Sequence, residues 1–299
     1  MTGAATITPE WVARHLPSRP QRAHKGDFGR LLVVAGSTEY PGAALLTALG
    51  AMRAGAGVVR VAVAASVAAR LAAAIPELTW MVLDEEAPGL VAPSGWRRVT
   101  TEAIGYDAVV LGPGLGRHPA MQRRIRNLVA SLRVPAAIDA DGLNALAEGG
   151  NWWTGLRAAL VLTPHPGEFA RLTDADVALD DDDAVRSRAA QDASSRWGQV
   201  VVLKGANTVV AGPEGELLRS DVASPALATA GTGDVLAGVT GAFLAGGLSP
   251  LIAAGCAVAI HGGAGLLAEG RIGRAGVMAR DIAALLPEAM EQARGERGR

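Results

Sequence analysis

The segment LLVVAGSTEYPGAALLTALGAMRAGAGVVRVAV, which runs from Leu31 to Val63, decides the fold. Its start, Leu31–Ala35, is a short apolar run typical of a buried strand. A helical pattern follows over Ala43–Ala54, and a second apolar run extends from Val58 to Val63. This alternation of strand, helix and strand predicts an α/β fold with a largely parallel sheet.

The same alternation continues along the chain. Further strands are predicted at Ala108–Leu111, Ala136–Asp139, Ala159–Leu162 and Val200–Leu203. A parallel sheet of this kind carries helices on both faces. With 299 residues, of which 49% are hydrophobic, the chain can bury a large core, and we interpret residues 1–299 as a single domain.

Polar residues follow several of these runs. Ligands of parallel sheets bind beyond the carboxyl ends of the strands, so the residues there are candidates for a site. They are Gly112, Gly114 and Gly116 in GPGLG, then Asp139, Asp141, Thr163, His165, Glu168, Lys204 and Gly205. GPGLG departs from the dinucleotide-binding fingerprint, because its last glycine comes one residue early, and this disfavours a Rossmann NAD site.

The stretch ATAGTGDVLAG, Ala228–Gly238, indicates a phosphate site. The backbone N–H groups of Gly231, Thr232 and Gly233 can surround an anion at the positive end of the following helix. We expect Asp234, in the first helical turn, to point toward this anion and to act as a general base on an attacking hydroxyl. A tight turn with an aspartate helix cap is the structural alternative.

Three other candidates have two interpretations each. His165 lies between two prolines in a turn, which favours contact with a ligand over a plain surface position. Glu168 is either a first-turn helix carboxylate or a residue that holds Mg²⁺ through water. Lys204 either neutralises phosphates or extends its ammonium to solvent.

Charge and cysteine content exclude several classes of protein. The net charge of -1 gives no sign of nucleic-acid binding. The single cysteine, Cys256, lies in an apolar run, which indicates a packing role and a reducing, cytoplasmic compartment. The N-terminus lacks a secretion signal, and Thr8–Glu10 predict a helix start. We interpret Asp180–Asp183 as a solvated helix start, and His261 and the tryptophans as packing residues.

One stretch is apolar enough to suggest a membrane span, because no charged residue lies between Asp234 and His261. Gly246–Gly247 and Ser249–Pro250 interrupt it, and we expect two pieces that are each too short for a bilayer. Two closely packed core helices explain the stretch better, so no membrane partner is expected.

Seven motifs carry a family resemblance. They are HKGDFGRLLVVAGS (24–37), YPGAALLTALGAMRAGAG (40–57), GPGLG (112–116), DADGLNAL (139–146), TPHPGE (163–168), LKGANT (203–208) and ATAGTGDVLAG (228–238). In this order they resemble the ADP/ATP-dependent NAD(P)H-hydrate dehydratases over about residues 24–287. The resemblance implies a ribokinase-like fold and an enzyme that repairs damaged nicotinamide cofactors.

The resemblance also implies a reaction and a set of contacts. The S epimer of hydrated NADH or NADPH would be dehydrated at the expense of ADP or ATP, with Mg²⁺. Asp234 would contact the hydrate and act as the base, while the anion loop holds the phosphates. The further contacts implied are Ala43, Gly116 and His165 for the hydrate, and Lys204, Gly205, Ala206, Asn207, Thr208, Gly231, Thr232 and Gly233 for the nucleotide.

Relatives are often tetramers, so the resemblance implies a homo-oligomer. Many relatives carry an N-terminal epimerase domain; this chain has no room for one, and a separate epimerase is the expected partner. TPHPGE stands where sugar kinases often have Asn-x-x-Glu, and Ser224–Ala226 stand where relatives often have Asn-Pro-Gly.

Two alternatives to the dehydratase stay open. A hydroxymethylpyrimidine or hydroxyethylthiazole kinase of the same fold would stop at the phosphorylated product. A nucleotide-binding sensor without turnover is the alternative from another class, and Asp234 beside an intact anion loop disfavours it.

Overall fold

The computed structural model describes residues 4–174 and 182–295. The strands of its main sheet are β1 (Ala5–Thr6), β2 (Arg30–Val34), β3 (Val58–Ala64), β4 (Thr79–Leu83), β7 (Ala108–Leu111), β8 (Ala136–Ile138), β9 (Leu160–Leu162), β10 (Val200–Leu203), β11 (Val209–Ala211) and β12 (Leu217–Arg219). A separate hairpin pairs β5 (Glu85–Ala87) with β6 (Leu90–Val91).

Within the described residues the main sheet has ten strands in the order β1-β12-β11-β10-β9-β8-β7-β2-β3-β4. Only β11 runs against its neighbours there, since it is antiparallel to β10 and to β12. The other pairs are parallel, from β9 with β10 to β3 with β4. The predicted α/β fold with a largely parallel sheet is confirmed.

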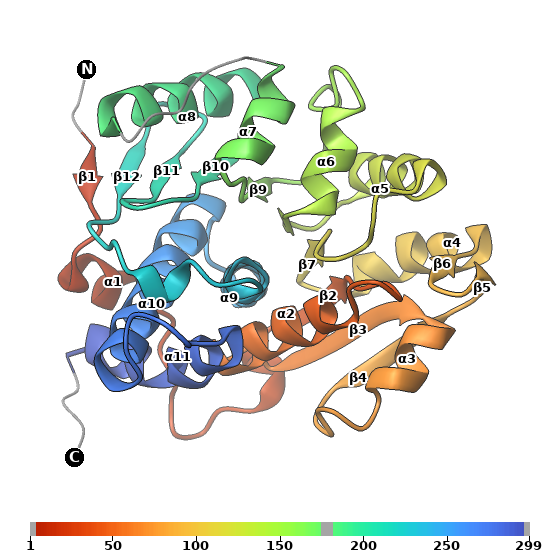
Figure 1. Cartoon of the computed structure of the whole chain (residues 1–299), viewed down its shortest axis with the longest axis horizontal. Coiled ribbons are helices and arrows are strands. Elements are labelled where there is room, and N and C mark those ends of the chain that lie inside the picture. The colour runs from red at the N-terminus through yellow and green to blue at the C-terminus, as the bar shows by residue number, and fades with distance from the viewer. Residues whose placement is uncertain (1–3, 175–181, 296–299) are drawn as a thin grey trace.

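Helices cover both faces of this sheet (Figure 1). Those on one face include α2 (Pro41–Arg53), α9 (Thr232–Ala245), α10 (Pro250–Arg271) and α11 (Ala279–Ala293). Those on the other include α5 (Pro119–Ser131), α6 (Asp141–Ala147), α7 (Pro166–Thr173) and α8 (Asp183–Trp197). The remaining helices are α1 (Pro9–His15), α3 (Ala65–Leu71) and α4 (Pro93–Glu102), with short 3-10 turns at Lys25–Phe28, Ala103–Gly105 and Pro225–Leu227.

The predicted strands and helices form with small shifts at their ends. The strand predicted at Leu31–Ala35 begins and ends one residue earlier, and Asp139 lies just beyond β8. Helix α2 begins at Pro41, two residues before the prediction, because proline suits the first helical position, where no N–H is needed. Strands β1, β4, β11 and β12 were not predicted, and most of them are too short to show a pattern.

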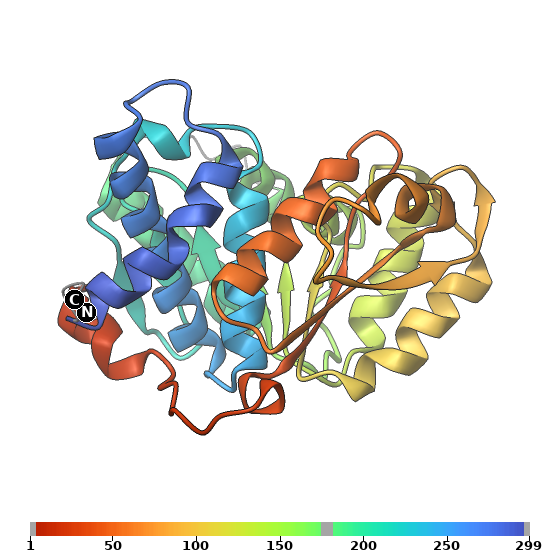
Figure 2. The same ribbon diagram turned by 90° about the horizontal axis from the view of Figure 1, so that it is seen from below.

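Helices α2 and α9 pack closely along each other, as Figure 2 shows. Glycines at the crossing make this possible, because a Cβ on Gly238 would lie 2.0 Å from the carbonyl oxygen of Thr47. On the other helix, a Cβ on Gly50 would lie 2.5 Å from the carbonyl oxygen of Val235. The close contact fixes the start of α9, and with it the predicted anion loop, above the sheet.

The long apolar stretch forms α9 and α10. The expectation that both pieces are too short for a bilayer is wrong, because α10 has 22 residues and continues past His261 to Arg271. Among the described residues it is the one helix long and apolar enough to cross a membrane by length and composition, yet 67% of its apolar window is buried inside the protein. It packs against α9 and α11, so the core-helix interpretation is confirmed.

Several local predictions are also confirmed. Thr8 caps α1 by accepting the N–H of Trp11. Cys256 is buried, and burial raises the pKa of its thiol to about 12, which fits an inert packing role. Of the acidic run, Asp182 caps α8 and Asp183 opens it, whereas Asp180 and Asp181 lie outside the described residues.

Candidate active site

The carboxyl ends of three neighbouring strands bring Asp139, Thr163 and Lys204 together. Asp139 follows β8 and is almost completely buried, with 2% of its surface exposed. Its Oδ1 lies 2.7 Å from Nζ of Lys204 and accepts a 2.8 Å hydrogen bond from the Thr163 hydroxyl. Oε2 of Glu168, in the first turn of α7, lies 3.8 Å from the same ammonium. Lys204 therefore pairs with buried carboxylates, and the alternative in which it extends to solvent is wrong.

The predicted anion loop lies at the start of α9, above this cluster. Gly231 caps the helix with φ of +90°, a left-handed conformation that a glycine adopts without strain. The Thr232 hydroxyl donates to the carbonyl oxygens of Leu227 and Thr229 at 2.8 and 2.9 Å. A Cβ on Gly233 would lie 3.4 Å from Nζ of Lys204, so the ammonium lies directly beside the loop.

His261, on α10, stabilises this loop through a hydrogen bond. Burial lowers the pKa of its imidazole to about 4, so the ring is neutral near pH 7. Nε2 lies 2.9 Å from the carbonyl oxygen of Thr232 and therefore carries the proton that it donates to that oxygen. The interpretation of His261 as a packing residue was incomplete, because the sequence alone does not show which helix end it faces.

Asp234 is the third residue of α9 and does not cap it, since the cap is Gly231. No described residue donates a hydrogen bond to its side chain, so the carboxylate is available to a ligand. Burial raises its pKa to about 7, and the nearby carboxylates of Asp139, Asp141 and Glu168 add to the rise, while Lys204 opposes it. A carboxylate with this pKa can accept a proton at neutral pH.

A cavity of about 550 Å³ opens between the anion loop and the segment after β10. Its lining includes six of the predicted nucleotide residues: Lys204, Gly205, Ala206, Thr208, Thr232 and Gly233. Asn207 and Gly231 are not in the lining. Asn207 has φ of +53° and donates to a carboxylate oxygen of Asp183 at 3.3 Å.

The residues predicted to contact the hydrate lie at the start of α2 and in the loops that follow β7 and β9. Ala43 is in the first turn of α2, where a Cβ on Gly114 would come within 2.7 Å of it, so the GPGLG loop touches this helix. The N–H of Gly116 donates to Oδ2 of Asp141 at 2.8 Å. Asp141 in turn helps to raise the pKa of Asp234. It therefore interacts both with the loop predicted to contact the hydrate and with the predicted base.

His165 has a structural role that its position between two prolines did not predict. It caps α7, because Nδ1 accepts the N–H groups of Gly167 at 3.0 Å and Glu168 at 3.3 Å. Its own N–H donates to Oε2 of Glu168 at 2.9 Å, which completes a capping box. About half of the side chain, 52%, is exposed, so the ring remains accessible to a ligand.

Two of the candidates, Asp139 and Asp141, had no individual role assigned from the sequence. Their position after a predicted strand identified them as site candidates only. Their importance is visible only in space, because Asp139 neutralises Lys204 and Asp141 orders the Gly116 loop.

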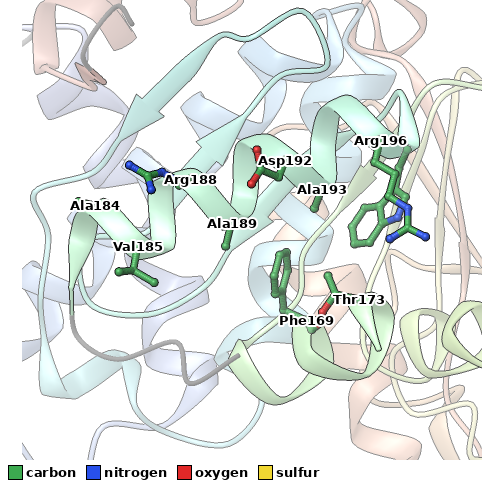
Figure 3. A pocket seen from close by; sticks show the side chains of 10 residues that line it. Phe169, Thr173, Ala184, Val185, Arg188, Ala189, Asp192, Ala193 and Arg196 are labelled. Atoms are coloured by element: carbon green, nitrogen blue, oxygen red, sulfur yellow. Dashed lines mark hydrogen bonds between the residues drawn. The ribbon is translucent and has the colours of Figure 1, made fainter. Parts of the chain in front are cut away.

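A second cavity, of about 450 Å³, lies between α7 and α8 (Figure 3). Phe169, Val185 and Trp197 give it a largely apolar lining, with Arg188, Asp192 and Arg196 also in it. None of the predicted site residues is among its lining residues. The cavity beside α9, in contrast, is lined by Lys204, Thr232 and Gly233.

Comparisons with known proteins agree with this geometry. A family model described as NAD(P)H-hydrate dehydratase matches residues 31–288. An ADP-dependent (S)-NAD(P)H-hydrate dehydratase from Xanthomonas campestris pv. campestris is 37% identical and covers 98% of this chain and 99% of its own length. The chain spans about half the length of the bifunctional NAD(P)H-hydrate repair enzymes that it also matches.

Solved structures show the same architecture. The ADP/ATP-dependent NAD(P)H-hydrate dehydratase from Bacillus subtilis, co-crystallised with ATP and Mg²⁺, is 31% identical with a TM-score of 0.84, and the match covers 98% of this chain and 100% of that one. A ribokinase-like superfamily protein from Enterococcus faecalis V583 is 24% identical with a TM-score of 0.82, covering 98% and 97%. The chain therefore has a ribokinase-like fold and belongs to the NAD(P)H-hydrate dehydratase family.

Proposed function

We propose that this chain uses ADP or ATP to dehydrate the S epimer of hydrated NADH and NADPH, here called NADHX and NADPHX, and so restores the reduced cofactors. The observation that carries the proposal is the position of Asp234. Its carboxylate is in the first turn of α9, directly after Thr232 and Gly233 of the cavity lining, and has a pKa raised to about 7, first by burial and also by charges that include Asp141, the acceptor of the Gly116 N–H.

The chemistry explains why a nucleotide is consumed. Hydroxide is a poor leaving group, because the pKa of water is about 15.7, whereas phosphate leaves readily. Asp234 takes the proton of the ring hydroxyl, the hydroxyl oxygen bonds to the terminal phosphorus, and the bond from that phosphorus to AMP or ADP breaks. The lone pair of the ring nitrogen then expels phosphate, and loss of a proton from the neighbouring carbon restores the double bond.

The chain's own groups stabilise the phosphoryl transfer. The N–H groups at the start of α9 point toward the phosphates, and the carbonyl of Thr232 is held by His261. Lys204 supplies a positive charge beside Gly233. Groups fixed in this way need little rearrangement as charge develops in the transition state.

Mg²⁺ is part of the proposal. No group of three His, Cys, Asp or Glu that could enclose a metal occurs among the described residues. Mg²⁺ bound to nucleotides usually uses one or two carboxylates, with phosphates and waters as its other ligands, and Asp139 and Glu168 fit this requirement beside the anion loop. The ion would neutralise phosphate charge there.

The decisive experiment incubates the purified chain with NADHX and ADP or ATP while the NADH absorption band is followed. Recovery of the band with release of phosphate supports the proposal. Nucleotide consumption without recovery would indicate a kinase that stops at the phosphorylated product, and nucleotide binding without consumption would indicate a sensor. Titration of ADP against ATP in the same assay measures nucleotide preference.

We further propose a homotetramer, which the resemblance implies, a cytoplasmic location, which the single cysteine indicates, and cooperation with a separate epimerase, which the resemblance also implies. Light scattering on the purified chain measures the first of these. For the last, addition of an NAD(P)HX epimerase should allow a mixture of R and S hydrates to be converted completely.

A further inference from the structure

Two arginines lie beside the hydrate loops and have been given no role so far. Arg117 follows Gly116, and its Nε lies 3.7 Å from Oδ1 of Asp141. Asn144 donates from Nδ2 to the same oxygen at 3.2 Å, and Arg171 donates from Nε to Oδ1 of Asn144 at 2.9 Å. We call Arg117, Asp141, Asn144 and Arg171 the arginine network, which connects α6 with α7.

The arginine network lies next to His165. Nη1 of Arg171 is 3.8 Å from the position that a Cβ on Gly167 would take, so its guanidinium turns back toward the start of α7. The pKa of His165 is lowered first by burial and then by the positive charges of Lys204 and Arg171, with a smaller effect of Arg117. Both guanidinium groups are therefore close enough to the imidazole for their charges to affect it.

Most N–H donors of the two guanidinium groups in the arginine network remain available to a ligand. The carboxylate of Asp141 already accepts the N–H of Gly116 and the amide of Asn144. Each guanidinium has five N–H donors, and only Nε is directed at the network. The side chain of Arg117 is 61% exposed, and among the described residues no carboxylate forms an ion pair with Arg171.

We propose that Arg117 and Arg171 bind the pyrophosphate of the hydrated dinucleotide. This inference rests on the proposed function, because the reacting ring must then lie at Asp234. In a dinucleotide a ribose separates the ring from the pyrophosphate, so the pyrophosphate lies further out. Asp141 is 15% exposed and its neighbour Arg117 is 61% exposed, so the arginine network extends from a largely buried carboxylate to an exposed guanidinium.

Guanidinium groups suit this ligand, since they bind phosphate oxygens through two parallel hydrogen bonds. The nucleotide phosphates are assigned to a different set of groups, the anion loop and Lys204. The site would therefore hold two phosphate groups of different origin at two places, one for the co-substrate and one for the substrate.

The test is calorimetric binding of NADHX, NADPHX and ADP, each alone, to the full chain and to Arg117→Ala and Arg171→Ala. Loss of one charged hydrogen-bonding partner should weaken NADHX and NADPHX equally, by about tenfold, and leave ADP within about twofold. Arg117→Lys and Arg171→Lys, which keep the charge without the planar fork, should fall between wild type and alanine. Arg133→Ala is the control, since this exposed arginine precedes β8 at the opposite end of the strand.

Each other outcome overturns the inference. Unchanged affinity for both hydrates excludes the contact, a loss confined to NADPHX assigns the arginines to the 2′-phosphate, and an equal loss for ADP assigns them to the nucleotide cavity. Because binding needs no turnover, wild-type chain that binds the hydrates without converting them would count against the proposed function and not against the arginines.

Discussion

Nζ of Lys204 and Oδ1 of Asp139 lie 2.7 Å apart, although 65 positions separate the two residues in the chain. The pair lies below the anion loop, where Nζ is 3.4 Å from the position of a Cβ on Gly233. Lys204 is thus shared between a buried carboxylate and the proposed phosphate site. Its removal should affect both stability and nucleotide binding.

We expect Lys204→Ala to raise the KM for ADP or ATP more than it lowers kcat, because a fixed point charge helps the ground state and the transition state similarly. The change also leaves Asp139 buried and unpaired, which costs roughly 3 kcal/mol of unfolding free energy. Steady-state kinetics and thermal unfolding measure the two effects. Adding Asp139→Asn should recover part of the lost stability but not the KM, and an unchanged nucleotide KM in Lys204→Ala would contradict the assignment.

Asp234→Asn should abolish dehydration and preserve nucleotide binding. Asparagine has the size of aspartate but cannot take the hydroxyl proton, and loss of a general base costs about 10²–10⁴ in rate. ADP affinity should be equal or higher, since a negative charge near the phosphates is removed. Turnover above about a tenth of wild type would show that Asp234 is not the base.

The pKa of Asp234 predicts a pH dependence. Because the base must be deprotonated, kcat should rise with pH through about 7 and level off above it. The folded pKa lies above the usual value of 3.8, so the folded state binds the extra proton, and stability due to this group falls as pH rises from about 4 to about 7. Asp234→Asn should therefore raise Tm more at pH 8 than at pH 4, whereas a Tm gain that is the same at both values would argue against the raised pKa.

His165→Ala should weaken NADHX binding and leave ADP binding nearly intact. It also removes a helix cap, which costs about 1 kcal/mol. His165→Asn separates the two effects, because asparagine can cap α7 but lacks the exposed imidazole. Titration calorimetry should show weak NADHX binding in both variants, and thermal unfolding should show a near-normal Tm only in His165→Asn. Normal NADHX affinity in His165→Asn would show that His165 acts only as a helix cap.

His261→Phe should lower kcat about tenfold or more, because the Thr232 carbonyl loses its donor and the anion loop is less rigidly held. His261→Gln, whose amide nitrogen can replace Nε2, should retain most activity. Thr240→Val is the control, since it removes a buried hydroxyl from α9, the helix that begins at the anion loop, eight residues beyond Thr232. If the two substitutions lower the stability to the same extent and neither lowers kcat, His261 has a packing role only.

Local sequence determined the type of the main elements and the glycine-rich turn at the start of α9. Apolar runs such as Val200–Leu203 can be read as strands because a strand buried on both faces needs no polar positions. The loop around Gly231 is likewise local, since its glycines and the helix start are consecutive in the chain. The motifs around them identified the family.

Only the tertiary structure decided what the charged side chains do. Asp139 and Lys204 follow β8 and β10, Glu168 lies in the helix after β9, and their pairing depends on the order of these strands in the sheet. The pKa of Asp234 and the hydrogen bond of His261 depend on burial and on groups from distant segments. Electrostatic and hydrogen-bonding energies act through distance in space, so spacing along the chain could predict the residue types but not these contacts.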